Sequence, residues 1–306
     1  MLWGIDLGGT KIEGVILSAA SPDAVVVRRR IDTEAHKGYD HIVSQICMLV
    51  KLLENQTGLK PQAIGIATPG THDPATNAMK GCNTTCLNGR FLRDDLVAKL
   101  QIPVKLANDA NCFALAEATM GVIPDVLTDF RCVFGIIMGT GVGGGVVLKS
   151  PNGQVFPLNG LHGIGGEWGH NILEHNGYDC YCGKKGCREQ VLSGPSLQRF
   201  YEQKTGKSFT LKQIIDNHKQ GNDTPATETV DRMLEYFGRS LTTIINVLDP
   251  DAIVVGGGLS NIDLLYTEGI ERAKKYVFNN GIINTPILRP KLGDSAGVFG
   301  AAMLTV

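Results

Sequence analysis

The sequence has no excess of charge of one sign and no long apolar run. Lys and Arg total 29 and Asp and Glu total 30, so a net charge of −1 gives no general attraction to nucleic acid or to an anionic membrane. No apolar run reaches the roughly 18 residues of a membrane span. The first residues lack the basic and apolar regions of a cleaved signal peptide. We therefore expect a cytoplasmic protein without nucleic-acid or membrane partners.

Cysteine is also sparse, with eight residues in a chain of 306. This number is far too small for a disulfide scaffold, and a local cysteine cluster in a cytosolic protein more often indicates a metal site or catalysis. Disorder is excluded as well, because 43% of the residues are apolar and only 19% are charged. The length predicts about two domains.

Short apolar runs alternate with stretches of helical spacing, which is typical of an α/β fold. Strands are predicted over residues 2–7, 12–17, 24–27, 63–67, 104–107, 146–149 and 252–255. Helices are predicted over residues 41–53 and 112–120. The basic tract at residues 28–30 is interpreted as a solvated strand end, and the polar stretch 204–229 as surface helix and loop.

The pattern of the first strands restarts in the middle of the chain. Residues 135–148 align with residues 4–17 without a gap, and six of the fourteen positions are identical at an offset of 131. Any two glycine-rich hairpins share some resemblance, which is one explanation. The other is a duplicated α/β unit, in which each domain opens with a strand, a glycine turn and a second strand.

Glycine is abundant, at 38 residues, and it gathers in loops that suit phosphate. In the segment Asp6-Leu7-Gly8-Gly9-Thr10-Lys11, backbone N–H groups could approach phosphate oxygens, and Asp6 could hold a hydrated Mg²⁺. An ordinary β-hairpin explains the same residues.

A second glycine loop, Gly139-Thr140-Gly141-Val142-Gly143-Gly144, fits the dinucleotide fingerprint formally. That fingerprint must open a helix, whereas these glycines run into a predicted strand, so we reject it. The P-loop sequence is absent too. Two phosphate-type loops, one in each half, favour a nucleotide bound between two domains.

Two further segments leave a choice open. Gly256-Gly257-Gly258 follows an apolar run and either faces a nucleoside or forms a strand-to-helix turn. Asn108-Asp109 lies between a strand and a helix, where Asp109 either caps the helix or accepts a proton from a substrate hydroxyl.

The strongest local signal is a cluster of metal-ligand residues. One histidine and three cysteines fall within 18 residues, spaced H-x9-C-x-C-x4-C: His170, Cys180, Cys182 and Cys187. Four nitrogen and sulfur ligands suit a closed, tetrahedral Zn²⁺ site, although free thiols could also cluster by chance. Because no position remains open for water, we predict a structural zinc. The neighbouring Glu167 and Glu189 are then available to contact a polyol.

Together, these motifs resemble the ROK family (repressors, open reading frames and kinases) of sugar kinases. The resemblance extends from residue 6 to the Gly293-Asp294 segment. It implies an actin-like (sugar kinase/Hsp70 ATPase) α/β fold with two ribonuclease H-like domains and a cleft between them. We expect a small domain over residues 1–110, completed by a helix over residues 295–306, and a larger domain over residues 111–294 that carries the zinc loop.

The resemblance also implies roles for individual residues. Residues implied to contact ATP and Mg²⁺ are Asp6, Gly8, Gly9, Thr10, Lys11, Gly139, Thr140, Gly141, Gly256, Gly257 and Gly258. Residues implied to bind the sugar are Asn108, Asp109, Glu167, His170 and Glu189, with Asp109 as the general base. His170 would serve twice, because zinc on one ring nitrogen leaves the other N–H pointing at the sugar.

The substrate prediction rests on finer resemblances. Residues 82–89, 166–171 and 180–187 look most like the bacterial fructokinase/mannokinase branch, and Asn83, Asn88 and Gly89 become candidate sugar contacts. The short gap between His170 and Cys180 instead resembles glucokinase and N-acetylmannosamine kinase members. We expect phosphorylation of D-fructose to its 6-phosphate, with mannose or glucose as weaker substrates and N-acetylglucosamine as the runner-up.

Two other function classes would show different sequence features. A sugar-responsive repressor of the same family would carry a helix-turn-helix before the first glycine loop, where only five residues precede Asp6. A chaperone-like or filament ATPase of the same fold would lack the sugar carboxylates and the zinc cluster. The family resemblance also implies a homodimer.

Overall fold

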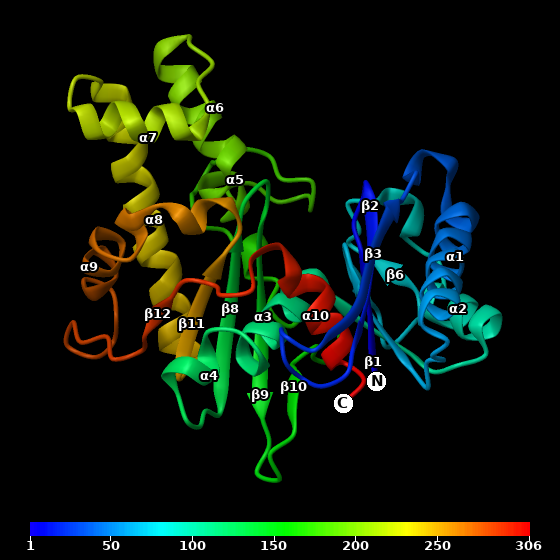
Figure 1. Ribbon diagram of the computed structural model, residues 1–306. Coiled ribbons are helices and arrows are strands. Elements are labelled where there is room, and N and C mark those ends of the chain that lie inside the picture. The colour runs from blue at the N-terminus through cyan, green and yellow to red at the C-terminus, as the bar shows by residue number, and fades with distance from the viewer. The chain divides into compact units, whose positions relative to one another are not determined.

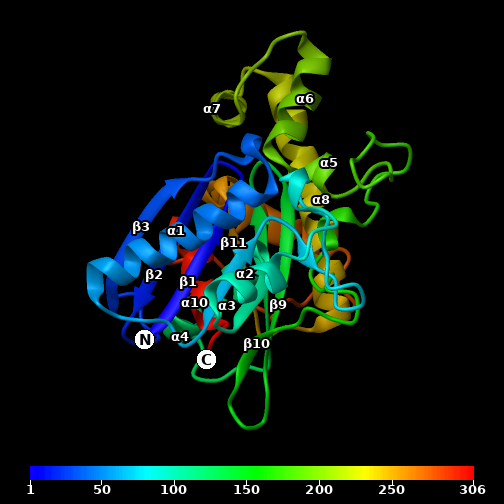
Figure 2. The same ribbon diagram turned by 90° about the vertical axis from the view of Figure 1, so that its right-hand side faces the viewer.

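The computed structural model describes all 306 residues, which form two compact units (Figures 1 and 2). Unit 1 comprises Met1–Arg131, Gly145–Gly166 and Lys291–Val306. Unit 2 comprises Cys132–Gly144 and Glu167–Pro290. The domain bounds expected from the sequence stay a prediction. None of the helices is long and apolar enough to cross a membrane.

The first sheet has five strands in the order β3-β2-β1-β4-β7. Its strands are β1 (Leu2–Leu7), β2 (Lys11–Leu17), β3 (Val25–Asp32), β4 (Ile64–Thr68) and β7 (Val104–Asn108). The first three strands form an antiparallel meander, and β4 and β7 then run parallel to β1. A small two-stranded sheet, β5 (Thr71–His72) and β6 (Met79–Lys80), follows β4 along the chain.

The second sheet repeats this topology, in the order β10-β9-β8-β11-β12. Its strands are β8 (Cys132–Met138), β9 (Val142–Lys149), β10 (Val155–Pro157), β11 (Ala252–Gly256) and β12 (Ile287–Leu288). Residues 135–148 occupy the β8–β9 hairpin, as residues 4–17 occupy the β1–β2 hairpin. The matching topologies support a duplicated α/β unit. The second glycine loop opens strand β9 and not a helix, which confirms the rejection of a dinucleotide fingerprint.

Helices cover both faces of the first sheet (Figures 1 and 2). The helices of unit 1 are α1 (Tyr39–Thr57), α2 (Leu92–Leu100), α3 (Asp109–Thr119), α4 (Ile123–Val126) and α10 (Ala296–Met303). Helix α1 buries a stripe with helical spacing that includes Ile42, Ile46, Leu49 and Leu53. This stripe packs against the sheet and confirms the helix predicted over residues 41–53.

Helix α10 packs on β1 and β4 through two glycines of the sheet. A Cβ atom on Gly4 would lie 2.3 Å from the Val298 carbonyl oxygen, and one on Gly65 would lie 1.8 Å from that of Ala301. Only glycine therefore permits the C-terminal helix to lie this close to the strands.

In unit 2, the helices are α5 (Glu189–Leu192), α6 (Gly194–Thr205), α7 (Leu211–Gln220), α8 (Thr224–Leu248) and α9 (Glu268–Lys274). The long helix α8 buries an apolar stripe through Val230, Leu234, Phe237 and Leu241. Helices α6, α7 and α9 pack against it. Helix α8 is thus the central helix of unit 2, against which the other helices pack.

The basic tract lies near the end of a strand and is largely exposed, as interpreted, and it also makes ion pairs. Arg28 and Arg30 lie inside β3, and both bond to the Glu13 carboxylate on β2. The strand therefore continues beyond its apolar residues to Asp32, and cross-strand ion pairs stabilise Arg28 and Arg30 in it.

Candidate functional site

The first glycine turn joins β1 to β2 and is a β-hairpin. The Gly8 N–H donates to the Lys11 carbonyl oxygen at 3.0 Å, and the Thr33 hydroxyl donates to the Gly8 carbonyl oxygen at 2.7 Å. The turn follows Asp6 directly, so the hairpin holds this carboxylate at the end of the sheet.

Asp6 is a buried carboxylate with an altered acidity. Burial, followed by the nearby carboxylates of Asp109 and Glu13, raises the pKa of Asp6 to about 7, although Arg30 and Arg28 act to lower it. A Cβ atom on Gly297 would lie 2.6 Å from the Asp6 Oδ2 atom, so α10 shields the group closely. A buried carboxylate with negative neighbours is a suitable ligand for a hydrated divalent cation, and this environment fits Mg²⁺.

Asp109 opens helix α3 immediately after β7. The residue that caps the helix is Asn108, whose Oδ1 accepts the Ala110 N–H at 2.9 Å. Asp109 Oδ1 lies 2.7 Å from the same N–H, and Asp109 itself is exposed. The capping role that the sequence left open therefore belongs to Asn108. An exposed carboxylate at the carboxyl end of a strand is in a position to act on a ligand.

A cavity of about 880 Å³ lies within unit 2 next to the second glycine turn. Its lining residues are Gly139, Thr140, Gly194, Pro195, Gln198, Leu211, Lys212, Ile215, Asp216, Lys219, Gly258, Leu259, Asn261, Ile262, Asp263 and Leu264. The structure thus brings together three of the residues predicted to contact ATP, namely Gly139, Thr140 and Gly258. Apolar walls with a few polar groups are typical of a small-molecule site of this size.

The turn at Gly256–Gly258 is the strand-to-helix turn that was one of its two interpretations, and a contact with a nucleoside stays a prediction. It leads from β11 into a short 3₁₀ helix (Gly258–Asn261), and Gly258 lines the cavity. Gly257 has a φ of +80°, and a Cβ atom there would lie 2.3 Å from the Met138 carbonyl oxygen. This glycine is therefore required by the conformation of the turn, whereas Gly258 has nothing within 4 Å of its Cβ position.

Sequence reasoning missed one wall of this cavity. Helix α7 lies in the stretch 204–229, which was interpreted only as surface, yet it contributes Leu211, Ile215 and Lys219. Two local signals mark this helix: a capping box between Thr210 and Gln213, and apolar residues with helical spacing. What no local signal shows is that the helix faces the turn at residues 139–140.

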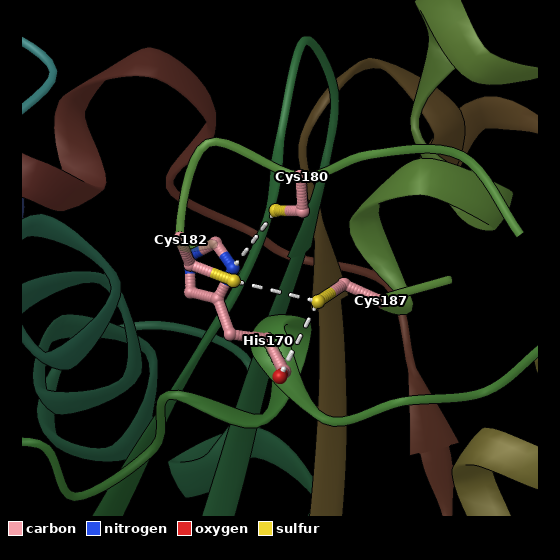
Figure 3. Close-up of side chains that lie close together, drawn as sticks. All are labelled: His170, Cys180, Cys182 and Cys187. Atoms are coloured by element: carbon pink, nitrogen blue, oxygen red, sulfur yellow. Dashed lines mark hydrogen bonds between the residues drawn. The ribbon is translucent and has the colours of Figure 1, made fainter. Parts of the chain in front are cut away.

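The predicted metal ligands converge in one cluster (Figure 3). Cys180 Sγ lies 3.6 Å from His170 Nδ1, Cys182 Sγ lies 3.5 Å from Cys187 Sγ, and all four ligand atoms lie within 4.8 Å of one another. Ligands at about 2.3 Å from a tetrahedral zinc are separated by roughly 3.8 Å. The cluster therefore fits Zn²⁺ in both donor type and spacing.

The second nitrogen of His170 lies beside a tyrosine hydroxyl. His170 Nε2 lies 2.9 Å from the Tyr181 hydroxyl, and the two rings meet edge to face with centroids 5.0 Å apart. That this nitrogen also points at the sugar, as the family resemblance implies, stays a prediction. Because Tyr181 stands between Cys180 and Cys182, the loop that delivers the thiols also places a phenol beside the imidazole.

Glu167 and Glu189 are both near the cluster. Burial raises the pKa of Glu167, with His170 acting to lower it and Glu189 to raise it. The Glu189 carboxylate accepts the Val142 N–H at 3.1 Å. A Cβ atom on Gly141 would lie 2.7 Å from Glu189 Oε2, so the second glycine turn is shaped to receive this carboxylate.

The candidate contacts in the segment 82–89 lie on an exposed loop of unit 1. Both ends of the Asn88 side-chain amide bond to the backbone of Cys82, at 2.8 and 3.0 Å. Gly89 has a φ of +76°. The structure thus gives Asn88 a role in holding the loop, and sugar contacts for Asn83, Asn88 and Gly89 stay predictions.

Comparison with known proteins identifies the family. A match to the ROK family covers residues 2–306. The N-acetyl-D-glucosamine kinase of Aliivibrio fischeri is 35% identical over 316 residues, which cover 100% of this chain and 99% of that protein.

Solved structures agree with this match. A ROK hexokinase from Thermus thermophilus has a TM-score of 0.84 at 28% identity, covering 99% of this chain and 96% of that chain. A ROK family glucokinase from Streptomyces griseus, solved with glucose and AMPPNP, has a TM-score of 0.76 at 25% identity, covering 99% and 98%. The chain therefore belongs to the ROK family, with its actin-like α/β fold, and is an ATP-dependent sugar kinase.

Proposed function

We propose that the sugar substrate is N-acetyl-D-glucosamine. The observation that carries this proposal is the full-length similarity, at 35%, to the N-acetyl-D-glucosamine kinase of Aliivibrio fischeri. The similarity spans both units, so it includes every residue implied in sugar binding. The N-acetyl sugar was the alternative in the sequence analysis, and this relative favours it over D-fructose.

The fructose prediction rests on less of the chain. It depends on three short segments, and the gap between His170 and Cys180 already departed from the fructokinase branch. Several hydroxyl-binding side chains suit any hexose, because they recognise hydroxyl groups and not the ring as a whole. Fructose thus remains the competing substrate that an assay must test.

In the proposed reaction, Asp109 is the general base. Its carboxylate accepts the proton of a sugar hydroxyl, and the hydroxyl oxygen forms a bond to the γ-phosphorus of ATP. The bond from that phosphorus to the β,γ-bridging oxygen breaks, and ADP leaves with the electron pair. The exposure of Asp109 and its position at the carboxyl end of β7 support this role. Phosphoryl transfer of this kind depends mainly on positioning and charge neutralisation.

The remaining roles are divided between groups of different chemistry. Asp6 would hold Mg²⁺, and the turn from Gly8 to Lys11 would contact phosphate oxygens. The cavity beside Gly139, Thr140 and Gly258 would receive the nucleoside, because its walls are largely apolar. Mg²⁺ would supply positive charge to the phosphates when bound.

Zn²⁺ would be held by His170, Cys180, Cys182 and Cys187 and would serve as a structural ion. The ligands begin three residues after Glu167 and end two residues before Glu189. Fixing the loop between these carboxylates would therefore orient both of them toward a sugar.

The test is a coupled kinase assay with N-acetylglucosamine, N-acetylmannosamine, fructose, mannose and glucose. We expect kcat/KM for N-acetylglucosamine to exceed that for fructose at least tenfold, which corresponds to about 1.4 kcal/mol. A kcat/KM for fructose equal to or above that for the N-acetyl sugar would contradict the proposal.

A further inference from the structure

Arg188 is a buried cation without a carboxylate partner. Its side chain follows the metal ligand Cys187 in the chain, and the residue is only 4% exposed. The guanidinium donates to three neutral acceptors: the Ser240 hydroxyl at 3.3 Å, the Trp168 carbonyl oxygen at 3.2 Å and the Thr243 hydroxyl at 3.0 Å. No Asp or Glu carboxylate oxygen lies within 4.0 Å of the Arg188 guanidinium nitrogens, which is the limit for an ion pair.

A second arginine, on the helix that carries two of these acceptors, shows the usual arrangement. Arg232 lies on α8, as Ser240 and Thr243 do, and it pairs with Glu174 at 2.7 and 3.0 Å. Glu174 belongs to the same zinc loop as Arg188. A buried charge is expensive unless an opposite charge lies near it. Arg232 obtains that opposite charge from Glu174, whereas Arg188 needs another source of negative charge.

The metal cluster can supply that charge. Three thiolates and a neutral imidazole on Zn²⁺ carry a net charge of −1. Cys187 is the chain neighbour of Arg188, and its Sγ lies 3.4 Å from the His170 carbonyl oxygen. Arg188 binds the other end of the same short turn, at the carbonyl oxygen of Trp168.

We propose that Arg188 is the counter-ion of the zinc–thiolate centre and the positioning residue that couples zinc binding to the turn between Glu167 and His170. The proposal rests on the zinc site proposed above. When the loop binds zinc, the guanidinium gains a compensating charge, and its hydrogen bonds attach the loop to α8.

Contacts of Trp168 extend this coupling to the second glycine turn. The guanidinium carbon of Arg188 lies 5.5 Å from the centre of the Trp168 ring, and the indole N–H donates to the Gly143 carbonyl oxygen at 2.8 Å. The loop, α8 and the start of β9 therefore share one hydrogen-bonded network. A change in the charge of Arg188 acts on that network from its centre.

The experiment compares Arg188→Met, which keeps most of the volume, with Arg188→Lys, which keeps the charge. Zinc release to a coloured chelator is followed over time, and unfolding by urea is measured for the zinc-loaded and metal-free full chain. We expect Arg188→Met to release zinc roughly 10–100-fold faster, the range typical for partners of metal ligands, and Arg188→Lys to stay within about threefold of the wild type.

Two matched controls separate charge from anchoring. A Ser240→Ala/Thr243→Val variant removes two acceptors and keeps the charge, so its zinc release should stay within about threefold of the wild type. Arg232→Met removes an arginine that has its own carboxylate, and it should destabilise the zinc-loaded and metal-free chains equally. Arg188→Met should instead destabilise the zinc-loaded chain more, because only that form contains the anionic centre.

The results distinguish a counter-ion role of Arg188 from a purely hydrogen-bonding role. Release of zinc from Arg188→Met at the wild-type rate, or equal destabilisation of its two forms, would overturn the proposal and leave Arg188 as a hydrogen-bonding anchor. A wild-type chain that binds no zinc would overturn the zinc site as well. Failure of the N-acetylglucosamine assay, in contrast, would leave these measurements unaffected.

Discussion

The two glycine turns occupy the same place in a repeated topology but differ in chemistry. At the end of β1 the chain has Asp6, whereas the equivalent position on β8, 131 residues later, has Ile137. Glu13, opposite Asp6 on β2, corresponds to Gly144. The strands that flank the first turn thus carry two carboxylates at positions where those of the second carry none.

What the second turn has instead is a cavity. The Gly194 N–H of α6 donates to the Gly139 carbonyl oxygen at 2.8 Å, and α7 supplies an apolar wall. A duplicated frame therefore fixes only where a turn lies. The residues at its edges decide whether it suits a cation or a nucleoside.

The largest expected effect comes from removing zinc. Chelation should abolish sugar phosphorylation, because the loop that orients Glu167 and Glu189 loses its metal ion. ATP binding should persist with a Kd within about threefold of the zinc-loaded value, since the cavity lies elsewhere in unit 2. Native mass spectrometry should find about one Zn²⁺ per chain, and adding zinc back should restore activity. Full activity in a metal-free preparation would refute the role of the loop.

Substitution of the proposed base should have the next largest effect. Asp109→Asn keeps the size and polarity of the side chain and removes the proton acceptor. We expect kcat to fall about 10²–10⁴-fold with a nearly unchanged sugar Kd, measured by calorimetry. Asp23→Asn, at an exposed position, serves as the control and should retain full activity. Near-normal kcat in Asp109→Asn would remove Asp109 from the reaction.

Two glycine substitutions should separate the sugar side of the second turn from its nucleotide side. In Gly141→Ala the added methyl group meets the Glu189 carboxylate at 2.7 Å, so we expect sugar KM to rise about tenfold. In Gly258→Ala the methyl group has open space toward the cavity, so ATP KM should rise and sugar KM should change little. Steady-state kinetics measures both, and identical effects of the two variants would argue against this division.

The last effect is on stability and not on activity, and it tests the carboxylate at the end of β1. Folding raises the pKa of Asp6 from 3.8 to about 7. As pH rises, Asp6 therefore loses its proton at a lower pH in the unfolded chain than in the folded chain. Stability should therefore fall between about pH 4 and pH 7 and then level off, by at most about 4 kcal/mol. Metal-free Asp6→Asn should lack this decrease in urea unfolding, whereas Asp23→Asn should retain it.

Much of the fold was predictable because its signals are local. Apolar runs and glycine pairs predicted β1, β2 and the repeated hairpin, and helical spacing predicted α1. The cluster of candidate metal ligands was predictable because all four residues lie within 18 residues of chain. Their convergence needs only a short loop that turns back on itself.

The rest depends on contacts between distant segments. Helix α7 and the turn at residues 139–140 line the same cavity although some seventy residues of chain separate them, and no spacing in the sequence encodes that arrangement. Likewise, the burial of Arg188 follows from the packing of α8 against the loop. The hydroxyl of Tyr181 beside His170 follows from how the loop closes, which the cysteine spacing leaves undetermined.

The most direct test of the contrast between the turns is nucleotide binding by wild-type and Asp6→Asn proteins with and without Mg²⁺. Calorimetric titration with AMPPNP should show that Mg²⁺ strengthens binding at least tenfold in the wild type. In Asp6→Asn this strengthening should be lost, while adenosine, which has no phosphate, binds both proteins equally. A strengthening by Mg²⁺ that is equal in both proteins would contradict the assignment of the cation to the first turn.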